Sequence, residues 1–148
     1  MTSPSGPDGV LAGSGAEAAT VQPIKRDEDV VRVRQLVRAL AVTAQLSLVD
    51  QTKLVTAASE LARNTLVHGG GGEAQVELVS KGPRAGVRAA FADEGPGIPD
   101  LDLALTDGYT TGRGLGLGLS GARRLVDEFE LDSKPGAGTR VTIVKWAR

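Results

Sequence analysis

The stretch SELARNTLVHGGGG, residues 59–72, joins a helix-forming segment to four consecutive glycines. Leu54, Ala58 and Leu61 recur at helical spacing, which predicts an amphipathic helix from about residue 50 to residue 68. Glycine commonly follows the last residue of a helix, so this helix should end where the glycines begin.

Two polar side chains at the edge of this apolar stripe form the first candidate site. Glu60 and Asn64 are four residues apart, about 40° around the helix, which directs a carboxylate and an amide toward one spot. Glutamate can take a proton from a hydroxyl group, and an amide oxygen is a suitable ligand for Mg²⁺. Taken alone, the same spacing also fits a solvated helix face on which Glu60 pairs with Arg63 or lies in water.

Patterns on either side of this helix predict further elements. Residues 27–44 have helical spacing, and residues 20–24 alternate like a strand in which Pro23 favours a sheet edge. Beyond the glycines, alternation at 74–78 and 87–91 predicts a hairpin.

The remaining elements follow in the last third of the chain. We expect strands near 129–133 and at 139–146 after a third helix. The residues expected on the buried side of that helix are Leu119, Ala122, Leu125, Val126 and Phe129. Together the elements indicate an α+β domain, a two-layer sandwich of a mixed, mainly antiparallel sheet with helices on one face. Residues 1–19, rich in Gly, Ser, Pro and Ala, are expected to form a flexible tail before one domain at 20–148.

Composition excludes several classes of function. The 148 residues carry 17 Lys+Arg and 18 Asp+Glu, for a formal net charge of −1, and no cysteine. The chain therefore lacks the positive field typical of nonspecific nucleic-acid or membrane binding, and it forms no thiolate zinc site or disulfide. No uncharged stretch approaches the roughly 20 residues of a membrane span, and no secretory signal is evident, so a cytoplasmic protein is expected.

Glycines supply a second candidate site. There are 20 of them, and the run at 112–121 opens the expected third helix, where backbone N–H groups can approach a phosphate. No Gly-Lys pair is present, which excludes a P-loop. Gly116, Gly118 and Gly121 match GxGxxG, but no strand precedes them as a dinucleotide site requires.

A third candidate is the segment DEGPG at the end of the expected hairpin. Asp93 precedes Gly95 and Gly97 where the chain leaves the sheet. Its carboxylate is placed to accept a hydrogen bond from an adenine amino group, although an aspartate in this position alone also indicates an Asx turn.

In chain order, ELARN, DEGPG, GRGLGLGL and GAGT resemble the ATP-site motifs of the GHKL ATPase and kinase superfamily, whose nucleotide-binding domain is the Bergerat fold. Glu60 and Asn64 resemble its N box. The glycine motifs are matched by Asp93, Gly95 and Gly97, then by Gly114, Gly116 and Gly118 at the lid, and finally by Gly136, Gly138 and Thr139. Residues 20–148 are similar to the anti-sigma regulatory serine/threonine kinases, most of all the RsbT-type switch kinases of the stressosome.

The resemblance implies a kinase that uses ATP and Mg²⁺, with Asn64 binding the metal and Glu60 orienting or deprotonating a Ser or Thr hydroxyl. The residues implied in nucleotide binding are Asn64, Asp93, Gly95, Gly97, Arg113, Gly114, Leu115, Gly116, Leu117, Gly118 and Thr139. Arg113 is the cation nearest the lid motif, where it either neutralises phosphate charge or lies in solvent.

The resemblance also implies partners. They are a STAS-domain antagonist or scaffold protein as phosphate acceptor and a PP2C-type phosphatase that is activated after release. We expect no nucleic-acid or membrane partner, and a monomer or weak homodimer. Two alternatives remain: a nucleotide-gated anti-sigma-type binding module without essential turnover, and a detached histidine-kinase ATP domain, for which no dimerisation helix with its histidine is present.

Overall fold

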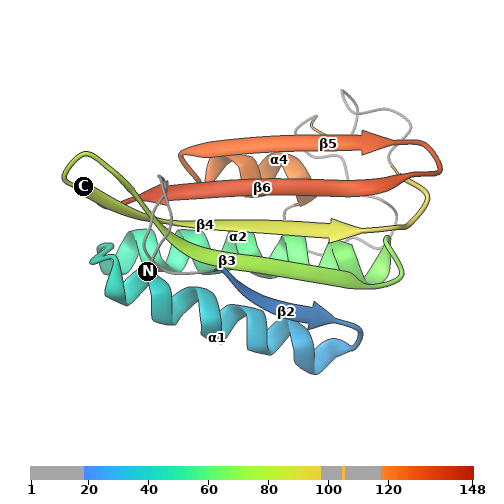
Figure 1. The fold of residues 1–148 in the computed structure, drawn as a ribbon, viewed down its shortest axis with the longest axis horizontal. Helices are drawn as coiled ribbons and strands as arrows, with labels where there is room; N and C mark the ends of the chain where they lie inside the picture. Colours follow the sequence, from blue (N-terminus) through green and yellow to red (C-terminus); the bar gives the residue numbers. More distant parts are fainter. Residues whose placement is uncertain (1–18, 98–104, 106–117) are drawn as a thin grey trace, which may run out of the picture.

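The computed structural model describes residues 19–97, 105 and 118–148, so the expected tail lies almost entirely outside the described residues. Five strands form one sheet in the order β2-β3-β4-β6-β5 (Figure 1). The elements in chain order are β2 (Thr20–Ile24), α1 (Asp27–Thr43), α2 (Leu48–Val67), β3 (Gly72–Lys81), β4 (Arg84–Asp93), α4 (Gly118–Arg124), β5 (Glu128–Lys134) and β6 (Gly138–Trp146).

All neighbouring strands among these five are antiparallel. The α+β fold class is confirmed, while the parallel pairing that a mixed sheet would contain is not found in the described part of the chain. The short strand β2 lies at an edge, as Pro23 predicted.

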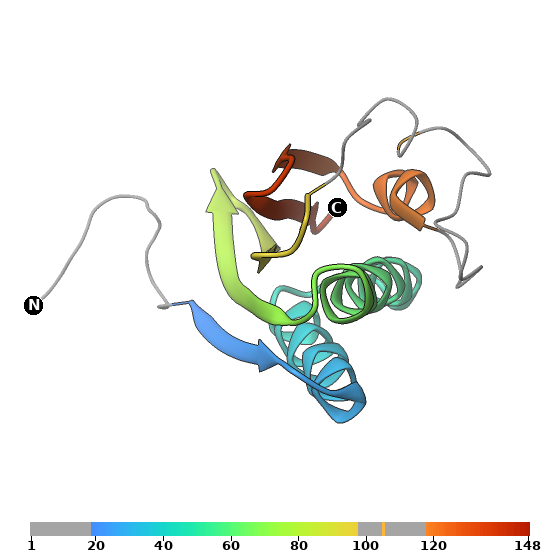
Figure 2. The same ribbon diagram turned by 90° about the vertical axis from the view of Figure 1, so that its right-hand side faces the viewer.

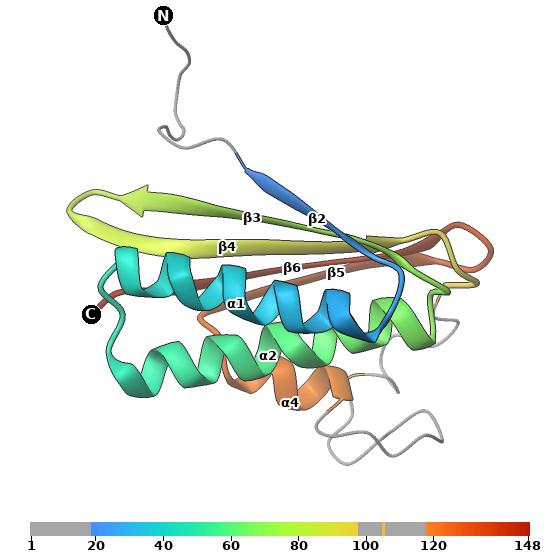
Figure 3. The ribbon, with the colours of Figure 1, turned by 90° about the horizontal axis from the view of Figure 1, so that it is seen from below.

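The three helices lie on one face of the sheet, which confirms the two-layer arrangement (Figures 2 and 3). Helix α2 lies between α1 and α4 and contacts both. The strands turn alternate residues toward the helices, and the core forms between the layers. The largest fully buried side chains are Phe91, Ile24, Leu54, Leu61, Ile143, Val30, Val33, Val37, Val76 and Val87.

Local hydrogen bonds fix where the first two helices begin. The Asp29 carboxylate accepts the backbone N–H groups of Lys25 at 2.9 Å and Arg26 at 3.2 Å, before the first turn of α1. These backbone hydrogen bonds, the first from Lys25, lower the pKa of Asp29. Ser47 Oγ accepts the backbone N–H of Asp50 at 3.1 Å and caps α2.

The third helix is shorter than predicted. Helix α4 ends at Arg124, Leu125 and Val126 lie in the turn that follows, and Phe129 belongs to β5. All three side chains pack against the core although none is helical. The sequence pattern therefore identified the apolar positions correctly but extended the helix over them, although Phe129 was also expected to begin the strand near 129–133, as it nearly does. A turn and a strand also bury part of their residues, so apolar spacing alone did not mark the end of the helix.

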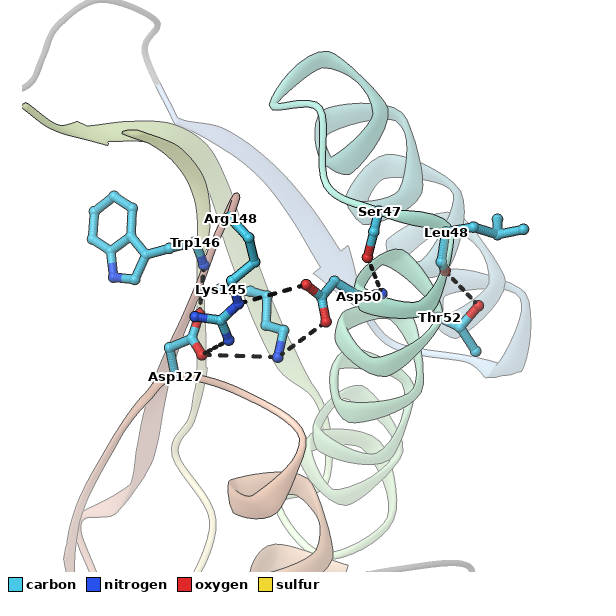
Figure 4. Close-up of polar contacts among 8 residues, drawn as sticks. All are labelled: Ser47, Leu48, Asp50, Thr52, Asp127, Lys145, Trp146 and Arg148. Atoms are coloured by element: carbon cyan, nitrogen blue, oxygen red, sulfur yellow. Dashed lines mark hydrogen bonds and ion pairs between the residues drawn. The ribbon is translucent and has the colours of Figure 1, made fainter. Parts of the chain in front are cut away.

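A group of charged side chains, in which Lys145 and Asp50 are buried and Arg148 is exposed, ties α2 to the far end of β6 (Figure 4). Lys145 is only 4% exposed, and its Nζ lies 3.6 Å from Asp50 Oδ1 and 3.8 Å from Asp127 Oδ1. Arg148 contacts both carboxylates, and the Trp146 backbone N–H donates to Asp127 at 2.7 Å. Burial raises the pKa of Asp127, but these hydrogen bonds and charges outweigh it, and the pKa is lowered. We call these four side chains, Asp50, Asp127, Lys145 and Arg148, the charge clasp.

Candidate functional site

Three segments meet at the end of the sheet opposite the charge clasp. Asp93, the last residue of β4, pairs with Gly72 at the start of β3 and with Thr139 near the start of β6. Asp93 and Thr139 continue the alternation of Phe91 and Val141, so they lie on the face of the sheet that carries the helices. The sheet therefore brings together a carboxylate and a hydroxyl from motifs 46 positions apart, as 139 − 93 gives.

The Asp93 carboxylate is half-buried and held by its own turn. Its Oδ1 accepts the backbone N–H of Gly95 at 2.8 Å, which is an Asx turn. The Asx turn, which the sequence analysis gave as the alternative role of Asp93, is thus present. It occupies one carboxylate oxygen, Oδ1, whereas Oδ2 accepts no hydrogen bond from the residues that the structure describes.

Gly69 links Asp93 to the end of α2. Its backbone N–H donates to the Asn64 carbonyl at 3.2 Å, and a Cβ added to it would lie only 2.6 Å from Asp93 Oδ2. The turn that follows α2 therefore lies directly against the Asp93 carboxyl group. Asn64 is half-buried at this corner, and Glu60 is half-buried one turn earlier on the same helix.

The remaining motif glycines bring two loops into contact. Gly136 donates its N–H to the Pro96 carbonyl at 2.7 Å, which joins the loop after β4 to the β5–β6 turn. Gly97 and Gly138 have φ of 79° and 90°, and any Cβ on them would collide with the Lys134 and Asp93 carbonyls respectively. Only glycine satisfies both the positive φ and the close approach.

Thr139 has a partner that the sequence analysis missed. Its hydroxyl lies 2.8 Å from the Ser133 hydroxyl, and Ser133 Oγ also lies 3.1 Å from the Gly138 carbonyl, to which it donates. Ser133 is directly opposite Thr139 in the β5–β6 register, and that register could not be read from spacing alone. The ends of β4, β5 and β6 also line a hollow of about 230 Å³, whose lining includes Ala92, Asp132 and Arg140 on the opposite face of the sheet as well as Ser133 and Thr139.

The predicted site residues fall into two groups. The structure brings Asn64, Asp93, Gly95, Gly97 and Thr139 to one corner, with Glu60 on the adjoining turn of α2. Gly118 is the first residue of α4, with φ of 69°, on a helix that contacts α2. The other predicted lid residues, Arg113, Gly114, Leu115, Gly116 and Leu117, lie outside the described residues.

Among the residues that the structure describes, no group of three or more His, Asp or Glu side chains is placed to hold a metal ion. Nor is any helix in the described ranges long and apolar enough to cross a membrane.

The two-layer fold and this corner define a nucleotide-binding domain of the GHKL class. The chain belongs to the family described as histidine kinase-, DNA gyrase B- and HSP90-like ATPases, whose model matches residues 49–147. The match begins in α2 and ends after β6, so it contains every predicted site residue.

Individual proteins of known name are also similar to this chain in sequence. The chain is 42% identical over 125 residues to the serine/threonine-protein kinase RsbT of Bacillus subtilis (strain 168), covering 84% of this chain and 94% of that protein. It is 29% identical over 119 residues to an anti-sigma F factor of Thermoanaerobacter sp. (strain X514), covering 76% of this chain and 82% of the relative.

A solved structure supports the fold. The crystal structure of the RsbU and RsbW domains of a Mycobacterium tuberculosis protein superimposes with a TM-score of 0.61 at 21% sequence identity. The superposition covers 89% of this chain and 33% of that longer chain. At this identity the likeness concerns the fold alone.

Proposed function

We propose that the protein is an ATP-dependent protein serine/threonine kinase that acts as a partner switch in sigma-factor regulation. The observation that carries the proposal is the meeting of Asp93, Thr139 and the turn that follows α2 at one corner of the sheet. This corner lies in a chain that aligns with 94% of a relative named as a serine/threonine kinase.

Adenine recognition is assigned to Asp93 and Thr139. Asp93 Oδ1 is engaged by the Gly95 N–H, which fixes the carboxylate and leaves Oδ2 to accept from the exocyclic amino group of adenine. Ser133 donates its hydroxyl proton to the Gly138 carbonyl, so the Thr139 hydroxyl donates to Ser133 and keeps a lone pair that can accept a hydrogen bond beside Asp93. Discrimination follows because a base with a carbonyl in place of the amino group would face the carboxylate with an acceptor.

Phosphoryl transfer is assigned to α2. The hydroxyl oxygen of the acceptor Ser or Thr attacks the γ-phosphorus, the bond to the bridging oxygen breaks, and ADP leaves. The Glu60 carboxylate orients that hydroxyl and takes its proton. Mg²⁺, when bound, neutralises phosphate charge. An amide oxygen at Asn64 fits this ion, which prefers oxygen ligands and commonly keeps one or two from the protein beside those of the substrate phosphates.

Finer assignments rest on the family resemblance. The acceptor is a Ser or Thr of a STAS-domain antagonist or scaffold protein, and the released kinase then activates a PP2C-type phosphatase. Arg113 and the glycines before α4 would hold the phosphate chain. The protein would act in the cytoplasm as a monomer or weak homodimer.

A Glu60→Ala variant tests the catalytic assignment. With radiolabelled ATP and a STAS-domain acceptor, we expect transfer to fall at least about 100-fold, the lower range for loss of a general base. ATP affinity, measured by calorimetry, should remain within about twofold because Glu60 is not assigned to adenine. Equal labelling by both proteins would contradict the kinase proposal and favour the alternative of a nucleotide-gated binding module, which the anti-sigma F relatives also suggest.

A further inference from the structure

The face of the sheet opposite the helices carries a hollow that the nucleotide site does not use. Figures 2 and 3 show all three helices on the other face. At the end of the sheet where β6 finishes, the uncovered face is hollowed to about 370 Å³. We call this hollow the sheet groove; the side chains that define it are Val79, Arg88, Glu128, Glu130, Val144 and Trp146.

The floor of the sheet groove is apolar at Val144, with the half-buried Thr142 beside it on β6. Val144 is only 7% exposed, although no described helix covers this face. Its low exposure means that longer side chains rise around it. A shielded apolar floor inside a polar rim is typical of a protein interaction site.

Trp146 forms a fixed wall of this groove. Gly86 is its direct partner on β4, and a Cβ built on Gly86 would lie 2.6 Å from Trp146 Cε3, so the indole ring lies on the bare backbone of β4. The ring Nε1–H donates to the Glu128 carboxylate at 2.8 Å. An aromatic side chain held in place before a partner arrives loses little conformational entropy on binding.

The β5 side of the groove rim carries two carboxylates, Glu128 and Glu130. Glu130 makes no ion pair with any residue that the structure describes, and among these residues Glu128 is engaged through the neutral indole N–H. The cation on the β4 side, Arg88, is paired with Glu77 at 3.1 Å, and Lys81 Nζ lies 5.9 Å from the indole centroid, near the limit for a cation–π contact.

We propose that the sheet groove docks an extended segment of a partner protein in which a Lys or Arg lies beside apolar residues. The apolar side chains cover Val144 and pack against Trp146, and the cation lies between Glu128 and Glu130. The groove is on the opposite face from Asp93 and Thr139, so this interaction is additional to the proposed kinase function.

Trp146 is the single tryptophan of the chain, so its fluorescence reports on the groove. The probes are two peptides of equal length, acetyl-LRVKL-amide and acetyl-LEVEL-amide, titrated into the full chain. We expect a saturable change in emission with the basic peptide and binding at least about tenfold weaker with the acidic one. Glu130→Lys should weaken binding of the basic peptide about five- to tenfold, because it replaces attraction at the rim with repulsion.

Glu28→Lys is the matched control, since it makes the same change in net charge on an exposed side chain of α1. It should leave peptide binding within about twofold of the unaltered chain. Absence of a saturable change, or equal weakening by both charge reversals, would overturn the proposal. So would a concentration-dependent dimer in sedimentation that Glu130→Lys abolishes, since the occupant would then be a second copy. ATP affinity of Glu130→Lys, expected to be unchanged, keeps this outcome distinct from failure of the nucleotide site.

Discussion

Gly69 has no side chain, and the space where one would lie is filled by the Asp93 carboxyl group. Its φ is not in the left-handed region, so alanine meets no backbone penalty there and its methyl group acts only by collision. We predict that Gly69→Ala displaces the Asp93 carboxylate and lowers ATP affinity at least about tenfold, a loss of about 1.4 kcal/mol. Calorimetric titration with ATP measures the effect.

The neighbouring glycine provides a control of opposite character. Gly70 has φ of 75°, and a Cβ there would meet nothing within 4 Å. Gly70→Ala should therefore cost about 1–2 kcal/mol of folding stability through backbone strain while leaving ATP affinity unchanged. If Gly70→Ala lowered ATP affinity as much as Gly69→Ala does, contact with Asp93 would not be the cause.

At the scale of elements, the charge clasp joins the start of α2 to the end of β6. Lys145 is buried between two carboxylates, so Lys145→Met leaves the buried Asp50 carboxylate with the exposed guanidinium of Arg148 in place of a buried cation. We predict a loss of about 3–5 kcal/mol in the free energy of unfolding, the usual cost of breaking a buried ion pair from one side. Urea denaturation monitored by circular dichroism measures it.

Arg148 belongs to the same clasp but its side chain is 60% exposed. Arg148→Gln should therefore cost less than about 1 kcal/mol, as expected for ion pairs screened by water. Equal losses in the two variants would mean that burial of Lys145 does not determine the strength of the clasp.

Acid should weaken the contacts that Asp29 makes at the start of α1 and that Asp127 makes in the charge clasp. The pKa values of Asp29 and Asp127 are lowered in the folded chain, so each carboxylate stabilises the fold while ionised. That contribution is present above the unfolded pKa of about 3.9 and is lost as pH falls toward the lower folded values. We predict that the melting temperature drops below about pH 4. The drop between pH 5 and pH 3 should be smaller in Asp127→Asn, whereas Asp132→Asn, an exposed carboxylate outside the clasp, should keep the full drop.

The sequence predicts those elements whose signals are local, and it misplaces those that depend on contacts between distant residues. Helices α1 and α2 and the β3–β4 hairpin are recovered because their apolar spacing and glycine stops are local. The end of α4 is misplaced because Leu125, Val126 and Phe129 are apolar for reasons of the turn and strand that follow. Periodicity reports burial and cannot by itself say which element provides it.

On the scale of the whole molecule, contacts between distant segments are the part that spacing could not supply. Asp50 and Lys145 are separated by almost the whole domain, and nothing near either residue indicates the other. The convergence of Asn64, Asp93 and Thr139 was implied by family resemblance, while the reasons for it came from the structure. These reasons are the close approach of Gly69 to Asp93 and the hydrogen bond between the Ser133 and Thr139 hydroxyl groups.

Because the proposed nucleotide site is built from three separate elements, it should exist only in the folded chain. The end of α2, β4 and β6 each contribute to one corner, so ATP should bind the folded chain and not the unfolded one. At 100 times its dissociation constant, such a ligand stabilises the fold by about 2.7 kcal/mol. For a chain of this length, that corresponds to a rise of about 5–10 °C in melting temperature.

Asp93→Asn tests whether the rise originates at this corner. The asparagine amide oxygen can still accept the Gly95 N–H, so the turn and the melting temperature without nucleotide should be kept. Its NH₂ group replaces the oxygen assigned to the adenine amino group, so a donor faces a donor and the rise with ATP should disappear. Differential scanning fluorimetry with and without ATP and Mg²⁺ makes the comparison. If ATP raised the melting temperature of Asp93→Asn as much as that of the unaltered chain, the adenine would not be bound by Asp93. ATP would then be held elsewhere.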